Sequence, residues 1–388
     1  MNTAELATEF GACTSEAARL AGLDHVVFYV ADLDARVREL QTRHGFAVVG
    51  TSDPAEADHR TMALRQGNIL LALTEGLSGE HPATVHVDSH GDGVADIVLG
   101  TPDVRAAFES AVASGARPLA APRLTGGIPT AAIHAFGDVR HTFVQRPAGT
   151  RRGTLPPGLT SAANSAPVAS AGLRELDHIA VCVQAGQLGP TVEFYQSVLG
   201  FQEIFEEQII VGAQAMNSRA VRNVAMDLTF TIIEPDTSRT PGQIDAFIES
   251  HGGAGVQHLA FSTPDIVKTV RTLRNNGVEF LTAPASYYEM LADRIDLTAH
   301  TVTELKELSI LADSDHAGQL YQIFARSTFP RNTYFTEIIE RRGAETFGSG
   351  NIKALYEAVE HERQSRESYR GAAKPSASSY SLAGTTSR

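Results

Sequence analysis

Two stretches of the chain share one pattern of apolar and polar positions. Residues 23–30 read Leu-Asp-His-Val-Val-Phe-Tyr-Val, and residues 176–183 read Leu-Asp-His-Ile-Ala-Val-Cys-Val. Apolar or small residues fill both alternating faces of each stretch, which predicts two interior β-strands. A helix-like run follows each copy and ends at Gly45-Phe46 and at Gly200-Phe201. The sequence therefore predicts an internal repeat in which one plan is built twice.

The remaining segments of each half follow the same plan. In the first half, strand-like segments at 46–49, 61–64, 69–73, 94–99 and 141–146 accompany helices expected at about 32–44 and 102–115. In the second half, a helix is expected at 190–199, with strands at 228–233, 255–261 and 335–341. Each half reads as two βαβββ modules, so the predicted fold class is α+β.

Changes in composition predict the domain boundaries. Residues 1–21 form a lead-in, and residues 22–148 form the first domain. A stretch rich in Pro, Gly, Ser and Ala at 149–173 has the composition of a linker. Residues 174–366 form the second domain, which ends in an amphipathic helix at about 351–366 that we expect to close over a pocket as a lid. The Ser-, Ala- and Gly-rich residues 367–388 are expected to be disordered.

Composition narrows the possible partners. The 388 residues carry a formal net charge of −13, which argues against nucleic acid and anionic membranes because both require a basic face. The N-terminus lacks the apolar segment of a signal peptide, and no apolar run approaches the roughly 20 residues of a membrane span. Cys13 and Cys182 lie far apart, which fits a reducing compartment. We expect a cytoplasmic protein, with a homo-oligomer possible.

Aligning the two halves brings out three strand positions that carry chemistry. The first half has His25, Asp96 and Thr142 at these positions. The second half has His178, His258 and Glu337. Only the second set combines two imidazoles with a carboxylate, which is typical of non-haem Fe(II) oxygenases. A lone histidine on a strand is more often a core residue, which is how we interpret His25.

Strand parity selects one of two nearby carboxylates. Glu337 and Glu340 are three residues apart on the strand expected at 335–341, so they face opposite ways. Glu337 shares its face with the apolar Ile339, which predicts that it points inward. For Glu340 we expect a solvated or arginine-paired carboxylate.

These residues also carry a family resemblance. Both halves resemble the vicinal oxygen chelate superfamily, whose paired βαβββ modules form open, barrel-like sheets around a metal. The second half resembles the 4-hydroxyphenylpyruvate dioxygenase family at residues 177–179, 255–258, 320–324, 337–341 and 347–355. The resemblance implies that His178, His258 and Glu337 bind Fe(II), and that the first domain is structural and holds no metal.

The resemblance and the spacing of the last helix also imply a substrate site. We expect catalytic contacts from Gln322, Phe324 and Ile352. The full set of substrate-binding residues is expected to be Ser218, Thr231, Gln243, Gln257, Gln322, Phe324, Ile352 and Tyr356. Ordinary loop hydrogen bonding is an equally good interpretation of Ser218 and Gln243.

Two departures from the ring-hydroxylating members of the family bear on the product. Those members have Phe-Pro-Ile-Asn-Glu-Pro where this chain has Phe-Thr-Ile-Ile-Glu-Pro at 230–235, and an aromatic residue in place of Ile352. Both departures, and the stretches 57–60 and 211–218, resemble the branch that makes 4-hydroxymandelate. The implied reaction takes 4-hydroxyphenylpyruvate and dioxygen to 4-hydroxymandelate and carbon dioxide. Alternatives are homogentisate formation, a metal-free binding protein of the superfamily, and a glyoxalase-type isomerase.

Overall fold

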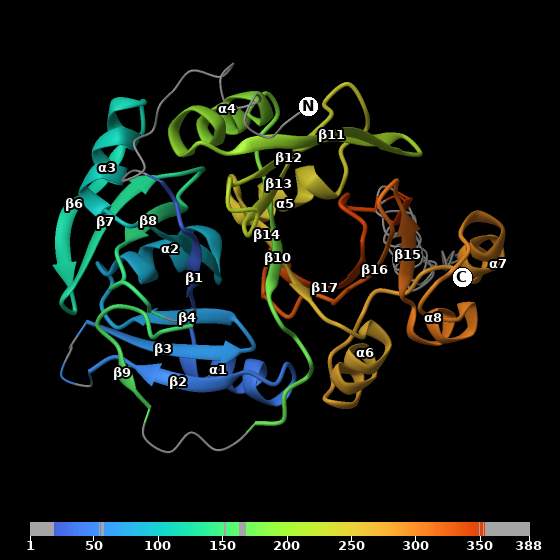
Figure 1. Cartoon of the computed structure of the whole chain (residues 1–388), viewed down its shortest axis with the longest axis horizontal. Coiled ribbons are helices and arrows are strands. Elements are labelled where there is room, and N and C mark those ends of the chain that lie inside the picture. Colours follow the sequence, from blue (N-terminus) through green and yellow to red (C-terminus); the bar gives the residue numbers. More distant parts are fainter. Residues whose placement is uncertain are drawn as a thin grey trace, which may run out of the picture.

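Two curved sheets lie next to each other, one formed by each half of the chain (Figure 1). The computed structural model describes residues 19–53, 55, 58–150, 153–162, 168–348, 350–351 and 353. Of the described helices, none combines the length and the apolar character needed to cross a membrane.

The first sheet has nine strands in the order β6-β7-β8-β5-β1-β4-β3-β2-β9. The strands are β1 (Gly22–Tyr29), β2 (Ala47–Thr51), β3 (His59–Gln66), β4 (Ile69–Gly76), β5 (Gly93–Gly100), β6 (Pro118–Thr125), β7 (Ile128–His134), β8 (Arg140–Val144) and β9 (Thr160–Ser161). The helices of this half are α1 (Leu33–Thr42), α2 (Pro82–His90) and α3 (Val104–Ala113).

The second sheet has eight strands in the order β11-β12-β13-β10-β14-β17-β16-β15. These are β10 (Leu176–Cys182), β11 (Gln202–Val211), β12 (Gln214–Arg222), β13 (Thr229–Pro235), β14 (Gly255–Ser262), β15 (Leu311–Ser314), β16 (Gln319–Phe324) and β17 (Phe335–Arg342). Its helices are α4 (Leu188–Leu199), α5 (Gln243–His251), α6 (Ile266–Asn275), α7 (Ala285–Arg294) and α8 (Val302–Leu308).

The pairing of the strands confirms the internal repeat and the α+β fold class. β1 pairs in parallel with β4 and antiparallel with β5, and β5 pairs in parallel with β8. In the second half, β10 pairs in the same way with β13 and β14, and β14 with β17. Each position of the first sheet from β6 to β2 thus has a counterpart in the second.

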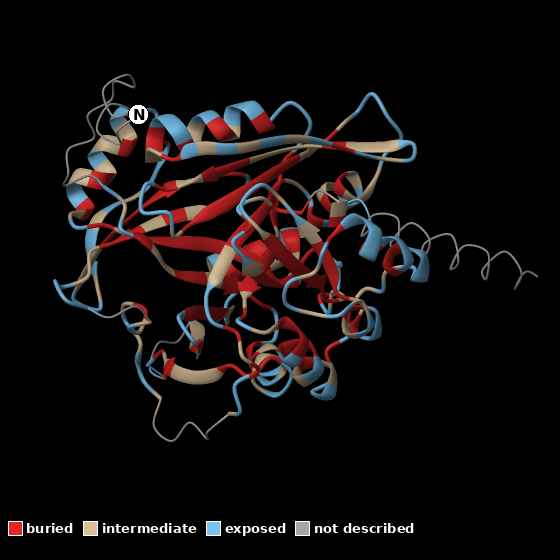
Figure 2. Cartoon of the chain, turned by 45° about the vertical axis from the view of Figure 1, so that its right-hand side comes forward, coloured by how far each residue is buried: buried red, intermediate tan, exposed pale blue. Residues whose placement is uncertain are grey.

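The core extends across both sheets, as the continuous buried band in Figure 2 shows. Apolar residues of the two halves pack in one cluster, in which the rings of Phe46 and Phe261 lie 6.0 Å apart. His141 of β8 is fully buried and contacts the hydroxyl of Tyr195 on α4 over 3.0 Å. Packing between the halves therefore holds the two sheets in a fixed relation.

Some elements were not predicted from the sequence. The pattern missed α2, β6 and β7 in the first half. In the second half it missed β11, β12, β15 and the four helices α5 to α8. Within the stretch 149–173, β9 pairs with β2, and Ala171 and Leu173 are buried. Of the lid helix predicted at 351–366, only residues 351 and 353 are described, and they are helical.

Candidate metal centre

Three neighbouring strands bring His178, His258 and Glu337 together. In the β10–β14 register, His258 lies opposite Ala180 and His178 lies opposite Ala260; Ala260 also lies opposite Glu337 of β17. The three side chains therefore leave adjacent strands on one face of the sheet. All three are buried, so the curvature of the sheet shields the cluster from solvent.

The ligand atoms converge at distances that a divalent ion requires. Glu337 Oε2 lies 3.4 Å from Nε2 of His178 and 3.2 Å from Nε2 of His258. Metal–nitrogen bonds of about 2.1 Å at right angles place neighbouring donors about 3 Å apart. Glu337 Oε1 is buried and has no hydrogen-bond partner among the described residues, and a metal ion would satisfy such an atom. Two imidazoles and one carboxylate fit a site that keeps coordination positions open.

A half-buried ion pair fixes the ring of His178. Asp177 Oδ1 lies 2.8 Å from Nδ1 of His178, and Arg341 donates from Nε and Nη2 to the two oxygens of Asp177. This places the Nδ1 proton on the Asp177 side, so Nε2, which faces Glu337, is the atom that could bind a metal after losing its own proton. Burial lowers the pKa of His178, but Glu337 and Asp177 outweigh it and raise this pKa to about 9.

Sequence reasoning missed Asp177 and Arg341, although the signal was present. The first half repeats the arrangement with the same residue types: Asp24 Oδ1 lies 2.6 Å from Nδ1 of His25, and Arg146 donates to both oxygens of Asp24. An Asp-His pair and a matching arginine recur at equivalent places in both halves. Comparing the two halves of the sequence would therefore have identified Asp177 and Arg341.

The ring of His258 is held by weaker contacts than the ring of His178. Its Nδ1 lies 3.4 Å from Oε1 of Gln257, and its ring stacks on Phe335 with centroids 4.8 Å apart. Burial lowers the pKa of His258, which favours the neutral, metal-binding ring. The pKa of Glu337 is lowered because His178 and His258 outweigh the effect of burial. The set therefore presents a carboxylate and at least one neutral imidazole at pH 7.

The equivalent positions of the first half are filled by a different ion pair. Arg140 donates from Nε to Asp96 over 2.7 Å, and the Thr142 hydroxyl donates to the same oxygen over 2.6 Å. Arg140 lies opposite Asp96 just as Phe335 lies opposite His258. The guanidinium thus supplies a positive charge beside Asp96 and Thr142.

A second group of potential ligands consists of Asp58, His59 and His81 at the surface. His81 caps helix α2, because its Nδ1 accepts a hydrogen bond from the backbone N–H of Ala83 over 3.1 Å. The neutral ring then carries its proton on Nε2, which leaves no lone pair there for a metal. This group is therefore a poor metal site compared with the buried one.

A cavity opens over the buried ligands, and the described residues predicted to bind substrate line it. They are Ser218, Thr231, Gln243, Gln257, Gln322 and Phe324. The sequence missed further lining residues that are mostly apolar, namely Phe205, Ile209, Met216, Phe335 and Phe347. Ile352 and Tyr356 lie outside the described residues.

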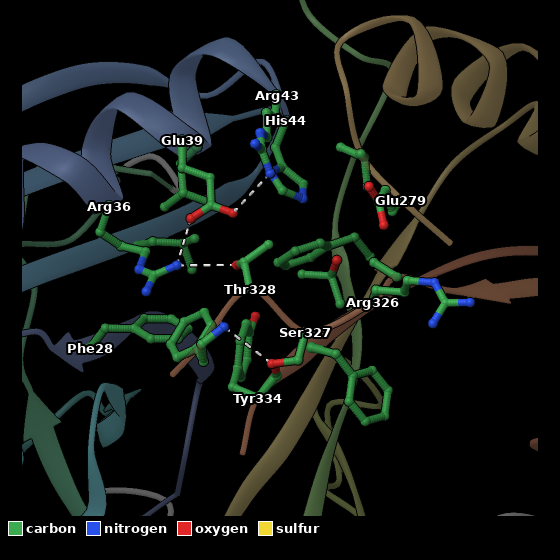
Figure 3. A pocket seen from close by; sticks show the side chains of 18 of the residues that line it. Phe28, Arg36, Glu39, Arg43, His44, Glu279, Arg326, Ser327, Thr328 and Tyr334 are labelled. Carbon is green, nitrogen blue, oxygen red and sulfur yellow. Dashed lines mark hydrogen bonds and ion pairs between the residues drawn. The ribbon is translucent and has the colours of Figure 1, made fainter. Parts of the chain in front are cut away.

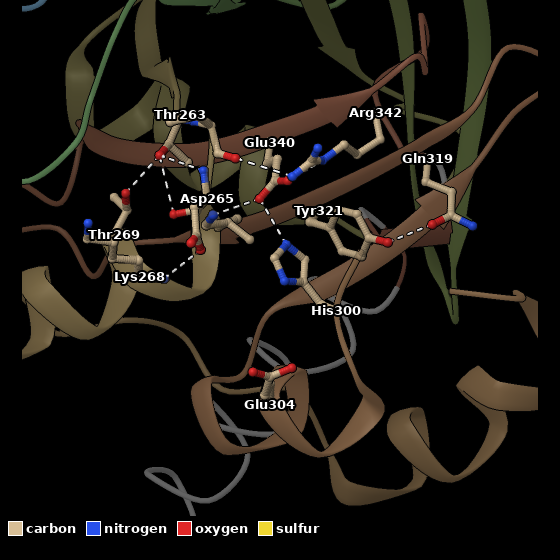
Figure 4. Close-up of polar contacts among 12 residues, drawn as sticks. Thr263, Asp265, Lys268, Thr269, His300, Glu304, Gln319, Tyr321, Glu340 and Arg342 are labelled. Carbon is tan, nitrogen blue, oxygen red and sulfur yellow. Dashed lines mark hydrogen bonds and ion pairs between the residues drawn. The ribbon is translucent and has the colours of Figure 1, made fainter. Parts of the chain in front are cut away.

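The prediction of a solvated Glu340 is wrong, while its pairing with arginine is confirmed. Glu340 is only 1% exposed, because the start of α6 and His300, which precedes α8, cover the face of β17 opposite Glu337. It accepts from the Ile266 N–H at the start of α6 and from Nε of Arg342, and lies 2.9 Å from Nε2 of His300 (Figure 4). Glu340 therefore holds three segments together.

Comparison with known proteins identifies the family. Residues 175–293 match the model of the Glyoxalase/Bleomycin resistance protein/Dioxygenase superfamily. The 4-hydroxyphenylpyruvate dioxygenase of Dictyostelium discoideum is 31% identical over 89% of this chain and 99% of the relative. The enzyme of the same name from Yarrowia lipolytica is 31% identical over 89% and 93%. This chain belongs to the 4-hydroxyphenylpyruvate dioxygenase family.

A solved structure of this family resembles the chain more closely in sequence. It is a triple mutant of 4-hydroxymandelate synthase from Streptomyces coelicolor, with a TM-score of 0.81 and 41% identity over 89% of this chain and 99% of that one. Membership of the 4-hydroxyphenylpyruvate dioxygenase family makes the chain a dioxygenase, and the buried His-His-Glu set is its candidate metal site.

Proposed function

We propose that the chain is an Fe(II)-dependent dioxygenase that converts 4-hydroxyphenylpyruvate and dioxygen to 4-hydroxymandelate and carbon dioxide. The observation that carries this proposal is the cavity over His178, His258 and Glu337, whose wall includes Thr231 and Ile233. These two positions depart from the ring-hydroxylating motif. The 41% identity to a 4-hydroxymandelate synthase, against 31% to the dioxygenases that share the family name, supports the same choice.

The metal site would supply one part of the chemistry. Fe(II) held by the two imidazoles and the carboxylate would activate dioxygen for the oxidative decarboxylation of a 2-oxo acid. The three protein ligands leave positions for the carboxylate and keto oxygens of the substrate. Asp177 and Arg341 keep the His178 ring in the orientation that this requires.

The cavity walls would orient the rest of the substrate. Gln322 is 1% exposed, and its amide NH₂ can donate to the 2-oxo acid. Phe324 and Phe335 meet edge to face with centroids 6.1 Å apart and offer aromatic surfaces to the phenol ring. Thr231 and Ile233, both buried, form a neighbouring wall on β13. These contacts decide which carbon of the substrate faces the metal.

A modest change in the wall is enough to change the product. Attack on the ring leads to homogentisate, whereas attack on the benzylic carbon gives 4-hydroxymandelate. A difference of about 1.4 kcal/mol between the two barriers gives tenfold selectivity, and positioning alone can supply that amount. The competing function, homogentisate formation, is favoured by the names of the relatives at about 31% identity.

Product analysis tests the proposal directly. The purified protein is incubated with Fe(II), air and 4-hydroxyphenylpyruvate, and the products are separated by chromatography. We expect 4-hydroxymandelate as the main product, with homogentisate minor or absent. Homogentisate as the main product would place the chain with the ring hydroxylases.

Two substitutions connect the product to the wall. Ile233→Asn restores one residue of the ring-hydroxylating motif and should raise the homogentisate fraction. Ile232→Val is the matched control, because Ile232 lies on the opposite face of β13 in the core cluster. Ile352→Phe should also raise that fraction, an expectation from the sequence alone. Unchanged product ratios in both test variants would contradict the assigned role of this wall.

A further inference from the structure

A second cavity lies between the two halves of the chain and shares one wall with the metal pocket. Its volume is about 220 Å³, and Phe335 lines both cavities. Figure 3 shows α1 of the first half on one side, and Ser327, Thr328 and Tyr334 of the second half facing it. Among the described residues, none of those predicted from the sequence to bind substrate lines this space.

The walls of this interdomain cavity are mainly aromatic and aliphatic. They include Phe28, Leu71, Leu73, Phe261, Phe329 and Tyr334. An apolar cavity of about 150 Å³ is large enough to hold benzene. The interdomain cavity therefore has room for an aromatic ring with a short substituent.

One end of the cavity carries polar atoms that form no hydrogen bond, although Glu39 Oε1 pairs at 3.9 Å with Nη1 of Arg43, which also lines the cavity. Arg36, Glu39 and His44 all line it. Arg36 Nε, Glu39 Oε1 and His44 Nδ1 are buried, and none forms a hydrogen bond within the described part of the chain. A buried polar atom without a hydrogen bond destabilises the folded state. Three of them beside one apolar cavity indicate a guest that can both donate and accept hydrogen bonds.

The charges at this end favour an uncharged guest. Arg36 donates to Glu39 over 2.5 Å and to Asp92 over 3.0 Å, so its positive charge is already compensated. Its guanidinium also lies over the ring of Phe329, 4.0 Å from the centroid. Burial lowers the pKa of His44 to about 4, so this ring is neutral at pH 7. A hydroxyl group suits such an end better than a carboxylate or an ammonium group.

We propose that the interdomain cavity is a second binding site, for a small aromatic molecule that carries a hydroxyl group, such as a para-substituted phenol. The ring lies among Phe28, Leu73 and Tyr334, and the hydroxyl lies beside Glu39 and His44. An occupant there packs against Phe335, whose ring stacks on His258. The site is thus placed to influence the metal pocket, and it does not depend on which product the enzyme makes.

Calorimetric titration of the iron-loaded protein with 4-ethylphenol tests this site. We expect a saturable site that disappears in Leu40→Trp, because Leu40 on α1 lines the cavity and the indole fills it. Leu199→Trp is the matched control, since Leu199 is a half-buried leucine on the equivalent helix α4. Identical saturable titrations of wild type and Leu40→Trp would place 4-ethylphenol elsewhere in the protein. Either that result or the absence of saturation would overturn the proposal.

The hydroxyl group is tested with ethylbenzene, which lacks it. One buried hydrogen bond of about 1 kcal/mol gives roughly fivefold tighter binding of 4-ethylphenol. Equal affinities would refute the assignment of the polar end. If Leu40→Trp does not fold, wild-type crystals soaked in 4-bromophenol locate the guest by bromine scattering. We expect a peak between α1 and Tyr334, and a peak only over the metal ligands would reject the site.

Discussion

Arg341 donates to both carboxylate oxygens of Asp177, from Nε to Oδ2 over 2.7 Å and from Nη2 to Oδ1 over 2.8 Å. The same Oδ1 lies 2.8 Å from Nδ1 of His178. The orientation of His178, a candidate metal ligand, thus depends on this bidentate pair. Its two parallel hydrogen bonds require the planar guanidinium and the carboxylate to face each other directly. Residues that sit behind a ligand in this way commonly affect metal affinity or activity 10- to 100-fold.

Replacing Asp177 with asparagine should weaken metal binding about 10- to 100-fold. The amide loses the charge that pairs with Arg341 and stabilises the Nδ1 proton of His178. Iron affinity is measured by competition with a chelator. Asp24→Asn is the control, because Asp24 makes the same contacts with His25 and Arg146 in the half without the ligand set. Equal losses of affinity in both variants would point to general destabilisation.

Removing the carboxylate of Glu337 should reduce metal binding by more than about a hundredfold, because two imidazoles alone remain. We expect one iron per chain in the wild type and none in Glu337→Ala, measured by elemental analysis after gel filtration. Thr142→Ala removes the equivalent first-half side chain, which donates to Asp96. It should keep one iron and near-normal turnover. Two irons per wild-type chain would contradict the single-site assignment.

Loss of Glu340 should destabilise the fold while sparing the metal site. Glu340→Ala leaves the Ile266 N–H and His300 without their buried partner, so the free energy of unfolding should fall by about 3 kcal/mol. Glu304→Ala breaks an exposed capping box on α8 and should cost about 1 kcal/mol. Denaturant unfolding measures the free energy of unfolding of both variants. Equal losses of this free energy would mean that the buried contacts of Glu340 stabilise the fold no more than an exposed capping box does.

Stability should decrease in acid partly because of His141. Burial lowers the pKa of this fully enclosed ring from 6.5 to about 4. As the pH falls, the unfolded chain therefore takes up this proton before the folded chain does. The stability that the neutral His141 ring contributes is complete above pH 6.5 and is lost as the pH falls towards 4. Between pH 7 and pH 5 the loss is about 2 kcal/mol. The free energy of unfolding is measured with urea at both pH values. Between pH 7 and pH 5 it should fall less in His141→Asn than in the wild type, by about 2 kcal/mol.

The repeat made most of the fold predictable. Alternation of apolar residues located β1 and β10, and matching the halves predicted the same topology twice. Three of the missed elements lacked such a signal: β6 is largely exposed and contains two prolines, and α7 and α8 have no counterpart in the first half. Without a second copy, a short amphipathic segment is difficult to distinguish from a loop.

Strand parity placed Glu337 correctly but could not describe Glu340. Parity states which face of a strand a side chain occupies, not what covers that face. Here α6 and the segment before α8 bury Glu340, and both pack there through contacts distant in sequence. The polar end of the interdomain cavity was hidden for the same reason, since Glu39 and Tyr334 are neighbours only after the halves meet.

The candidate ligands His178, His258 and Glu337 come from three strands that long stretches of chain separate. An unfolded or half-folded chain therefore has no preformed site, and an ion can bind only after β14 has entered between β10 and β17. Its binding free energy then adds to that of folding. A metal ion in this place acts as a cross-link that joins the ends and the middle of the second half, so the supply of iron would determine how long each folded molecule persists as well as whether it can react.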